Sequence, residues 1–234
     1  MTTMSIRGLH AGYGRVQVLH GIDLTLKPGE LTCVLGANGA GKTTLAKAIS
    51  GALRAQDGEI RLDGAPITSW SPERRSRHGV VLVPQGRCVF ANLTVAQNLE
   101  VARFAARKRR TDASGLAAEL FPRLAQLRDR KAGVLSGGEQ QMLAIARGLA
   151  AEPEVLVLDE PSLGCAPVIV EALYEAIRVV TRLRMAILLI EQVAEHALSV
   201  ADDVVVLRGG EIVDRGTAAD FTSGGRLSSH YLGD

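Results

Sequence analysis

The sequence predicts an α/β fold with a mostly parallel sheet. Short apolar runs of strand length alternate with helix-compatible segments along the chain. One of these runs, at 31–35, leads through a glycine-rich loop into a helix-compatible segment, and another, at 155–158, ends in two carboxylates. Strands of a parallel sheet are apolar throughout, as these runs are, because helices cover both faces of such a sheet.

Individual elements can be assigned in chain order from apolar periodicity and from turn residues. Strands are expected at 5–9, 18–26, 31–35, 60–62, 80–83, 155–158 and 186–190, with a loop around 12–14 and a closing hairpin of 204–207 and 212–213. Helices are expected to begin near 42, to run from 136–138 to about 150, and to cover 168–183.

The segment from about 94 to 130 has a different character. Ala, Leu and Arg dominate it and strand signals vanish, so we expect two or three helices there. A chain of 234 residues, 47% of them hydrophobic, is large enough for one core with a subdomain. We expect a single domain over 1–234, with a core of 1–87 and 152–234 and a helical subdomain at about 88–151.

Composition excludes several classes of protein. A net charge of +2 predicts no general attraction to nucleic acid, and the basic cluster of Arg103 and 107–110 is typical of a solvated helix face. Three cysteines, far apart in sequence, fit reduced thiols in a cytosolic protein. The first residues lack the apolar core of a signal peptide, and no run approaches the roughly 18 apolar residues of a membrane span.

The glycine-rich loop at 36–44 predicts a nucleotide site. It comprises Gly36, Ala37, Asn38, Gly39, Ala40, Gly41, Lys42, Thr43 and Thr44. Glycines let backbone N–H groups approach phosphates, and a helix beginning near Lys42 adds unpaired N–H groups and a partial positive charge. Lys42 suits the β- and γ-phosphates of ATP, and the Thr43 hydroxyl suits Mg²⁺. A plain strand-to-helix turn, the alternative, needs neither of these side chains.

Two adjacent carboxylates, Asp159 and Glu160, follow the apolar run at 155–158. Carboxylates at the end of a buried strand are costly unless a cation or proton compensates them. Asp159 is therefore the expected outer ligand of Mg²⁺, and Glu160 the expected general base for ATP hydrolysis. The alternative is that the pair caps the following turn through Pro161 and Ser162.

A third segment contains Ser136, Gly137, Gly138 and Glu139. A serine hydroxyl and two glycines at a helix N-terminus form a second anion-binding device. The segments 36–44, 135–140 and 155–160, in this order and spacing, resemble the nucleotide-binding subunit of an ABC transporter, and the resemblance covers nearly the whole chain. It implies the ABC type of P-loop NTPase fold, in which a mostly parallel core is joined by an antiparallel β part and a helical subdomain.

The resemblance also implies roles for further residues. Tyr13 lies where the family places a ring that stacks on adenine, although a tyrosine packing at a strand end is the alternative. Gln85 resembles the glutamine that contacts Mg²⁺ and the attacking water. Residues 136–139 would face the γ-phosphate of ATP held by a second ATPase subunit, so that two cassettes close head-to-tail around two ATP molecules.

Two positions depart from the family pattern. Gln192 follows Ile190 and Glu191 where most members have a catalytic histidine, and an amide can still donate a hydrogen bond to the γ-phosphate but cannot become cationic. We expect Gln192 to contribute to catalysis. Ala166 occupies the place of a loop aspartate that makes a contact across the dimer.

The segments 83–87, 161–164 and 190–192 are similar to the shorter, LivF-type ATPase subunit of branched-chain amino-acid importers. This resemblance implies a peripheral protein at the cytoplasmic face of the cell membrane. Its partners would be integral membrane permease subunits, a second ABC ATPase subunit and, indirectly, a substrate-binding protein, with no nucleic acid. A urea or short-amide importer ATPase and a soluble ATPase of an iron–sulfur assembly scaffold are the alternatives.

Overall fold

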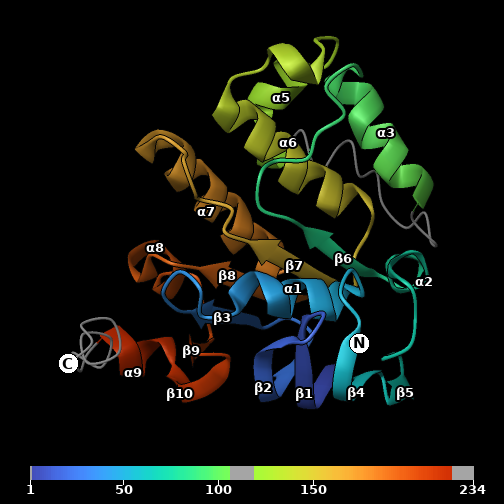
Figure 1. Cartoon of the computed structure of the whole chain (residues 1–234). Helices are drawn as coiled ribbons and strands as arrows, with labels where there is room; N and C mark the ends of the chain where they lie inside the picture. The colour runs from blue at the N-terminus through green and yellow to red at the C-terminus, as the bar shows by residue number, and fades with distance from the viewer. Residues whose placement is uncertain (1, 106–118, 223–234) are drawn as a thin grey trace.

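The computed structural model describes residues 2–105 and 119–222, which form two sheets and the helices around them (Figure 1). The larger sheet has the strand order β10-β9-β3-β8-β7-β6. Its strands are β10 (Glu211–Thr217), β9 (Asp203–Arg208), β3 (Leu31–Leu35), β8 (Ala186–Glu191), β7 (Val155–Asp159) and β6 (Val80–Val83). The strands from β9 to β6 run parallel, and β10 pairs antiparallel with β9. The predicted mostly parallel sheet is confirmed.

Burial explains why these strands are apolar. Every residue of β3, β7 and β8 is buried, because both faces of the sheet are covered. Alternate residues belong to two separate hydrophobic clusters: Cys33, Leu158 and Leu189 lie in one, and Val34 and Val157 in the other. Each strand therefore contributes to two cores at once.

The smaller sheet is antiparallel, with the order β2-β1-β4-β5. Its strands are β1 (Met4–Tyr13), β2 (Val16–Leu26), β4 (Ala55–Leu62) and β5 (Ala65–Pro66). The sequence prediction made the first three too short and missed β5. Glycines caused the error, since Gly58, at φ +88°, lies inside β4 where a Cβ would come within 2.2 Å of the Gly8 carbonyl oxygen. Such a glycine indicates an irregular strand pairing and not a loop.

Helices fill the space between and beyond the sheets. They are α1 (Lys42–Ser50), α2 (Pro72–Arg77), α3 (Val95–Ala105), α5 (Pro122–Gln126), the 3₁₀ turn η1 (Ala132–Val134), α6 (Gly137–Ala150), α7 (Pro167–Thr181), α8 (Ala194–Leu198) and α9 (Ala218–Thr222). The predicted helices near 42, at 136–150 and at 168–183 match α1, α6 and α7 within two residues. The short helices α2, α8 and α9 were not predicted, because five or six residues give too little periodicity.

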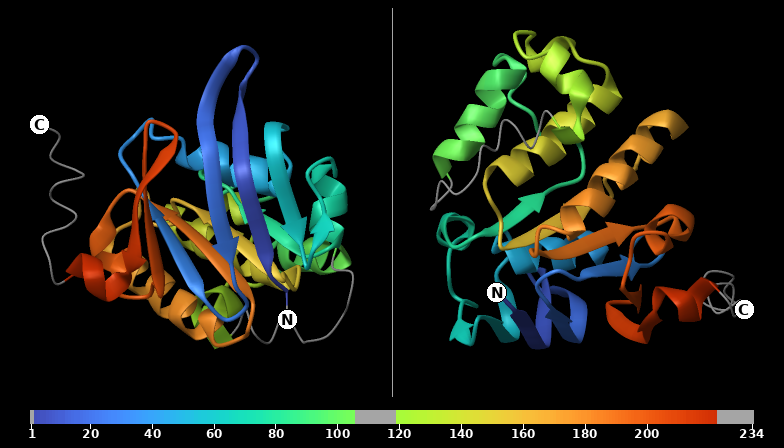
Figure 2. Two further views of the ribbon diagram at one scale, coloured as in Figure 1. Left: turned by 90° about the horizontal axis from the view of Figure 1, so that it is seen from below. Right: turned by 180° about the vertical axis from the view of Figure 1, so that it is seen from behind.

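The layers are clear in two views. Helix α1 lies between the two sheets, while α6 and α7 lie beyond the opposite face of the parallel sheet, and α3, α5 and α6 gather at the end farthest from the antiparallel sheet (Figures 1 and 2). This arrangement agrees with the predicted group of helices between 94 and 130. The boundaries of a helical subdomain at 88 and 151 stay a prediction, and 107–110 of the basic cluster lie outside the described residues.

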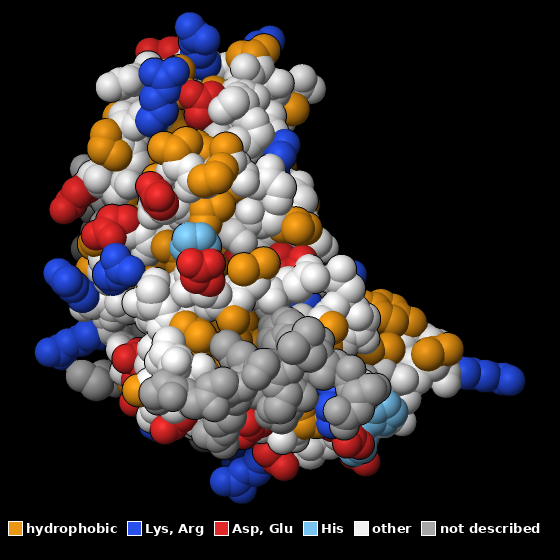
Figure 3. Space-filling view, turned by 90° about the vertical axis from the view of Figure 1, so that its left-hand side faces the viewer, with side chains coloured by type: hydrophobic (Ala, Val, Ile, Leu, Met, Phe, Trp, Pro, Cys, Tyr) orange, Lys and Arg blue, Asp and Glu red, His pale blue; other side chains and the backbone are white. Residues whose placement is uncertain are grey.

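The surface carries charges of both signs. On the side of the molecule shown in Figure 3, acidic and basic side chains are interspersed around exposed hydrophobic ones. Within 2–105 and 119–222, no helix has the length and apolar character that crossing a membrane requires.

Candidate active site

Parallel strands bring the predicted site residues to one edge of the sheet. Leu35 of β3 pairs with Glu191 of β8, and Asp159 of β7 pairs with Ile190, which also belongs to β8. The phosphate loop, the two carboxylates and Gln192 therefore all lie at or directly after the carboxyl ends of neighbouring strands. Ligands of open α/β sheets bind at this edge.

The phosphate loop ends at the first residue of α1. Gly41 is the N-cap of this helix in the left-handed region, at φ +105°, and the helix has no side-chain cap and no acidic residue in its first turn. A Cβ at Gly41 would come within 2.9 Å of Leu19 Cδ2, so the position favours glycine for both conformation and space. The first N–H groups of α1 are thereby left open to an anion.

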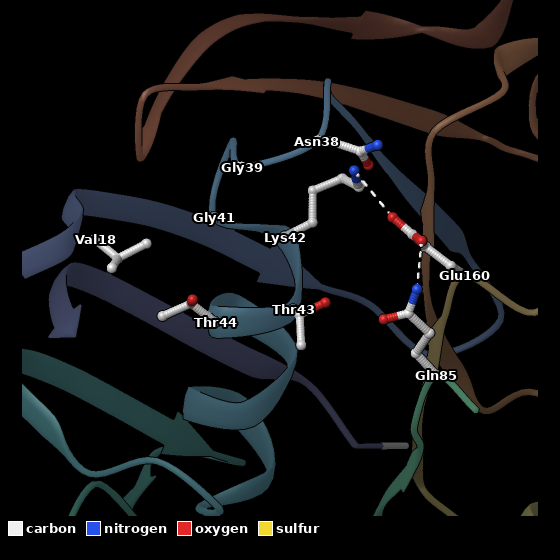
Figure 4. Close-up of a pocket in the computed structure, with 9 residues that line it drawn as sticks. All are labelled: Val18, Asn38, Gly39, Gly41, Lys42, Thr43, Thr44, Gln85 and Glu160. Carbon is white, nitrogen blue, oxygen red and sulfur yellow. Dashed lines mark hydrogen bonds and ion pairs between the residues drawn. The ribbon is translucent and has the colours of Figure 1, made fainter. Parts of the chain in front are cut away.

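A pocket of about 250 Å³ lies over this loop (Figure 4). Its lining residues are Val18, Asn38, Gly39, Gly41, Lys42, Thr43, Thr44, Gln85 and Glu160. Strand β2, the phosphate loop and the segments after β6 and β7 thus meet at one place. The structure brings together predicted residues that are separated by more than a hundred positions in the sequence.

Lys42 and Glu160 form an ion pair inside the site. Lys42 Nζ lies 3.0 Å from Glu160 Oε1, and the two side chains are only 4% and 8% exposed. The ammonium also donates hydrogen bonds to the carbonyl oxygens of Gly36, at 2.8 Å, and Ala37, at 3.2 Å. Gln85 Nε2 donates to Glu160 Oε2 at 3.0 Å (Figure 4). These partners compensate the buried charges, and the phosphates of a nucleotide offer Lys42 an alternative anion.

Asp159 lies beside the first turn of α1. Its side chain is 2% exposed, and its Oδ1 accepts a hydrogen bond of 3.3 Å from Thr43 Oγ1. Burial raises the pKa of Asp159 and the Glu160 charge adds to this effect, while the bond from Thr43 opposes it. A hydroxyl and a desolvated carboxylate are oxygen donors of the kind that Mg²⁺ takes, with phosphates and water completing its shell.

The backbone of Glu160 is unusual for a non-glycine residue. Its φ is 47°, in the left-handed region, and its N–H donates to the Ile190 carbonyl oxygen at 2.9 Å. Such conformations persist where the surrounding structure fixes them, and they are concentrated at functional sites. The turn after β7 thus directs the Glu160 carboxylate toward Lys42 and Gln85.

Tyr13 lies apart from the phosphate pocket. It is the last residue of β1, its ring is 48% exposed, and Lys47 Nζ of α1 lies 5.7 Å from the ring centroid. A half-exposed ring has a face available for a base, and it also fits a tyrosine packing at a strand end. Its role in adenine stacking stays a prediction.

The segment 136–139 does not line the phosphate pocket of its own chain. Ser136 is the N-cap of α6 and forms a capping box with Glu139, whose Oε2 accepts bonds from the Ser136 N–H, at 2.9 Å, and hydroxyl, at 3.0 Å. Arg123 Nε lies 3.0 Å from the other oxygen of Glu139. The backbone hydrogen bond from Ser136 contributes most to lowering the pKa of Glu139. Contact between this segment and a phosphate of another subunit stays a prediction.

Gln192 follows directly after β8 and does not line the pocket, so its catalytic role also stays a prediction. Its neighbour Glu191, which sequence reasoning missed, is 2% exposed and accepts a hydrogen bond from the Tyr174 hydroxyl. The available signal was a carboxylate at the end of an apolar strand, the same pattern that identified Asp159. Ala166, the other position that departs from the ABC family pattern, is the N-cap of α7 and provides no side-chain cap.

Comparison with known proteins assigns the class of protein. Residues 19–163 match the family model described as ABC transporter, and the chain belongs to this family. The protein is an ATPase of the ABC type. This finding confirms the resemblance of the three segments and the predicted fold class.

Within this family, the chain is similar to several individual proteins over nearly its whole length. The chain is 40% identical to the high-affinity branched-chain amino acid transport ATP-binding protein BraG of Pseudomonas aeruginosa, covering 94% of this chain and 95% of the relative. It is also 40% identical to a probable branched-chain amino acid transport ATP-binding protein LivF of Archaeoglobus fulgidus, covering 91% of each. The lipopolysaccharide export ATP-binding protein LptB of Haemophilus influenzae is 30% identical over 100% of this chain and 98% of its own.

Solved structures agree with the fold. The ADP conformation of an ATP-binding cassette of an ABC transporter has a TM-score of 0.85 and 25% identity, with 100% of both chains covered. A nucleotide-free cassette from an ABC transporter has the same TM-score at 24% identity, also over the whole of both chains. This second likeness concerns the fold alone.

Proposed function

We propose that this protein is an energising subunit of an ABC importer for branched-chain, hydrophobic amino acids. It binds ATP with Mg²⁺, pairs with a second ABC ATPase subunit, and couples hydrolysis to a membrane permease. The observation that carries this proposal is the 40% identity to BraG, which extends over 94% of this chain. The site geometry supports the ATPase part independently of the substrate.

The phosphate loop holds the nucleotide in this proposal. Backbone N–H groups of 36–44 and the N-terminus of α1 bind the phosphates, and Lys42 exchanges its ion pair with Glu160 for the β- and γ-phosphates. This exchange frees the Glu160 carboxylate. Tyr13 supplies the ring on which adenine stacks.

Thr43, Gln85 and Asp159 are the side chains that would hold Mg²⁺, which supplies charge neutralisation at the phosphates. Thr43 and Asp159 already share a hydrogen bond of 3.3 Å, and burial raises the pKa of Asp159, so a cation there relieves the cost of the buried carboxylate. The amide nitrogen of Gln85 faces Glu160, and its side-chain oxygen points away from Glu160, to the side on which Thr43 lies (Figure 4).

Glu160 acts as the general base, orienting water and accepting its proton as water attacks the γ-phosphate. Gln85 holds one oxygen of this carboxylate at 3.0 Å, which leaves the other for water once Lys42 has moved to the phosphates. Gln192 donates a hydrogen bond to the γ-phosphate from the end of β8.

The second half of the site comes from a partner. Ser136, Gly137, Gly138 and Glu139 would meet ATP held by another ATPase subunit, so that ATP itself stabilises the closed dimer. Two exposed hydrophobic side chains, Leu163 at 53% and Val168 at 68%, flank the loop at Ala166 and fit a surface that a partner covers.

The proposed location is the cytoplasmic face of the cell membrane, where the protein binds integral permease subunits and acts indirectly with a substrate-binding protein. The similarity to LptB, which serves lipopolysaccharide export, is a reason to test the substrate directly. A urea or short-amide importer and a soluble iron–sulfur scaffold remain the competing assignments.

The test is purification of the chain from native membranes together with its attached subunits. ATP turnover of this complex in vesicles should rise with leucine or valine presented by the binding protein, and a Lys42→Ala complex should show no rise. Stimulation by urea or acetamide instead would replace the substrate assignment. Co-purification with a soluble scaffold, and with no integral membrane protein, would contradict the importer.

A further inference from the structure

Glu191 is a buried carboxylate that the mechanism above does not use. It is the last residue of β8, and its side chain is 2% exposed. Its backbone pairs with Leu35, the residue before the phosphate loop, while the preceding Ile190 pairs with Asp159. Glu191 therefore lies between the two strands that carry the ATP site.

The Glu191 side chain holds the segment that follows Glu160. Its Oε1 accepts a hydrogen bond of 2.9 Å from the Tyr174 hydroxyl and one of 3.2 Å from the Ser162 N–H. Ser162 is two residues beyond Glu160, and Tyr174 lies on α7, the next helix in the chain. Burial raises the pKa of Glu191, and the bonds from Ser162 and Tyr174 oppose the shift. A buried carboxylate needs such donors.

The same strand fixes the Glu160 backbone from two sides. Glu160 has the left-handed φ of 47°, and its N–H bonds to the Ile190 carbonyl oxygen at 2.9 Å. The bond from Ser162 to Glu191 anchors the chain on the other side of Glu160. An L-residue in this conformation reverts to a common one unless its neighbours fix it.

We propose that Glu191 is a positioning residue for ATP hydrolysis, which holds the turn at 160–162 so that the Glu160 carboxylate faces Lys42 and Gln85. This inference rests on the proposed role of Glu160 as the general base. When Glu191 is lost, the turn gains freedom, and Glu160 is misaligned while the phosphate loop keeps its shape. Because small displacements of a catalytic group slow a reaction strongly, the rate should fall and ATP binding should not.

A purely stabilising role makes a different prediction. If Glu191 served only to satisfy Tyr174 and the Ser162 N–H, its replacement would lower the melting temperature and reduce binding and turnover together, in proportion to the folded fraction. The turnover number of folded protein separates these two roles.

The experiment compares Glu191→Ala, Glu191→Gln and Tyr174→Phe in the complex with its partner subunits. Steady-state kinetics give kcat and KM for ATP, a fluorescent ATP analogue gives Kd, and thermal unfolding gives Tm. Glu175→Ala is the matched control. The Glu175 carboxylate lies on α7 next to Tyr174, but it is 67% exposed and pairs with Arg178 on the surface.

We expect Glu191→Ala to lower kcat about tenfold with Kd changed less than about twofold, as a misplaced base would. Glu191→Gln should restore most of the rate, since its amide oxygen accepts the same two bonds. Tyr174→Phe, which keeps the ring but removes one donor, should give an intermediate loss and decides the question if Glu191→Ala does not fold. Glu175→Ala should match the wild type.

Two results would overturn the inference alone: wild-type kcat in both Glu191→Ala and Tyr174→Phe, or a loss of rate matched by an equal loss of ATP binding. A Glu160→Gln complex that hydrolyses ATP at the wild-type rate would instead overturn the proposed role of Glu160, and this inference with it.

Discussion

The two helix N-termini predicted to bind phosphate differ in how much of their hydrogen bonding they satisfy themselves. At α1, the N-cap is Gly41, with no side-chain cap and no acidic residue in the first turn. At α6, Ser136 and Glu139 cap one another, and Arg123 pairs with Glu139. The first terminus is open to an anion, whereas the second already holds a carboxylate.

The two halves of the proposed site are therefore suited to different tasks. The α1 end, with Lys42, suits tight binding of phosphates by a single chain. At the α6 end, the capping box of Ser136 and Glu139 already uses part of the hydrogen-bonding capacity of the helix N-terminus. This end therefore fits a weaker contact, which forms when another subunit brings a phosphate to it.

Glu160→Gln should have the largest effect. Loss of a general base lowers the rate about 100-fold or more. ATP binding should be kept or tightened, because Lys42 no longer has the Glu160 carboxylate as a competing partner at 3.0 Å. Turnover and ATP affinity measured on the same preparation check both effects. Turnover at the original rate would remove Glu160 as the base.

Lys42→Ala should weaken ATP binding by about 2–3 kcal/mol, the value of charged hydrogen bonds, which corresponds to roughly 30- to 150-fold in Kd. Equilibrium binding of the isolated chain measures this effect. Lys27→Ala is the matched control, since Lys27 precedes β3 at the end of that strand away from the phosphate loop, is 55% exposed, and pairs with Glu30 on the surface. Equal losses in the two variants would contradict a specific role for Lys42.

Ser136→Ala should separate the two helix ends. It removes the N-cap of α6, at a cost of about 1 kcal/mol in stability. ATP binding by the isolated chain should be unchanged. Turnover by the assembled complex should fall about tenfold, because in our proposal Ser136 also contacts the ATP held by the partner subunit. Weaker ATP binding by the isolated chain would place the segment in its own site and end the contrast.

Gln192→Ala should slow turnover by a few-fold, the size of one lost neutral hydrogen bond in the transition state. KM for ATP should change little. Steady-state kinetics at saturating ATP test this prediction, and unchanged turnover would remove Gln192 from the catalytic set.

The fold and most of the α1 half of the site were predictable because they depend on local patterns. Apolar runs gave the parallel strands, and parallel strands bring 36–44, Gln85 and Asp159 to one edge. Glycines made β1 and β4 look shorter than they are, because Gly12 lies within β1 and Gly58 lies within β4. The sequence does show Glu191 as a carboxylate at the end of an apolar strand, but it does not show its role, because its donors, Tyr174 and the Ser162 N–H, come from separate elements that meet only in the fold.

The smallest effect is expected on the stability of the nucleotide-free protein, when Asp159 is replaced by Asn (Asp159→Asn). Since burial raises the folded-state pKa of Asp159 above its unfolded value, the folded state binds the extra proton, and stability falls as pH rises through the folded pKa. At neutral pH and without nucleotide, the Asn variant should therefore melt at a higher temperature than the wild type, because it has no buried charge at this position. Near pH 4 the difference should shrink. Thermal unfolding across this pH range checks the sign, and a variant that is less stable at neutral pH would contradict it.

The dependence of ATP turnover on dilution shows whether one chain alone can complete the catalytic site. Turnover per chain and ATP affinity are measured on the same samples across a dilution series, with and without the second ATPase subunit, while sedimentation reports the state of association. We expect a monomer to bind ATP with undiminished affinity and to hydrolyse almost none, and we expect turnover to appear with the dimer. Full turnover per chain in samples that sediment as monomer would contradict this expectation.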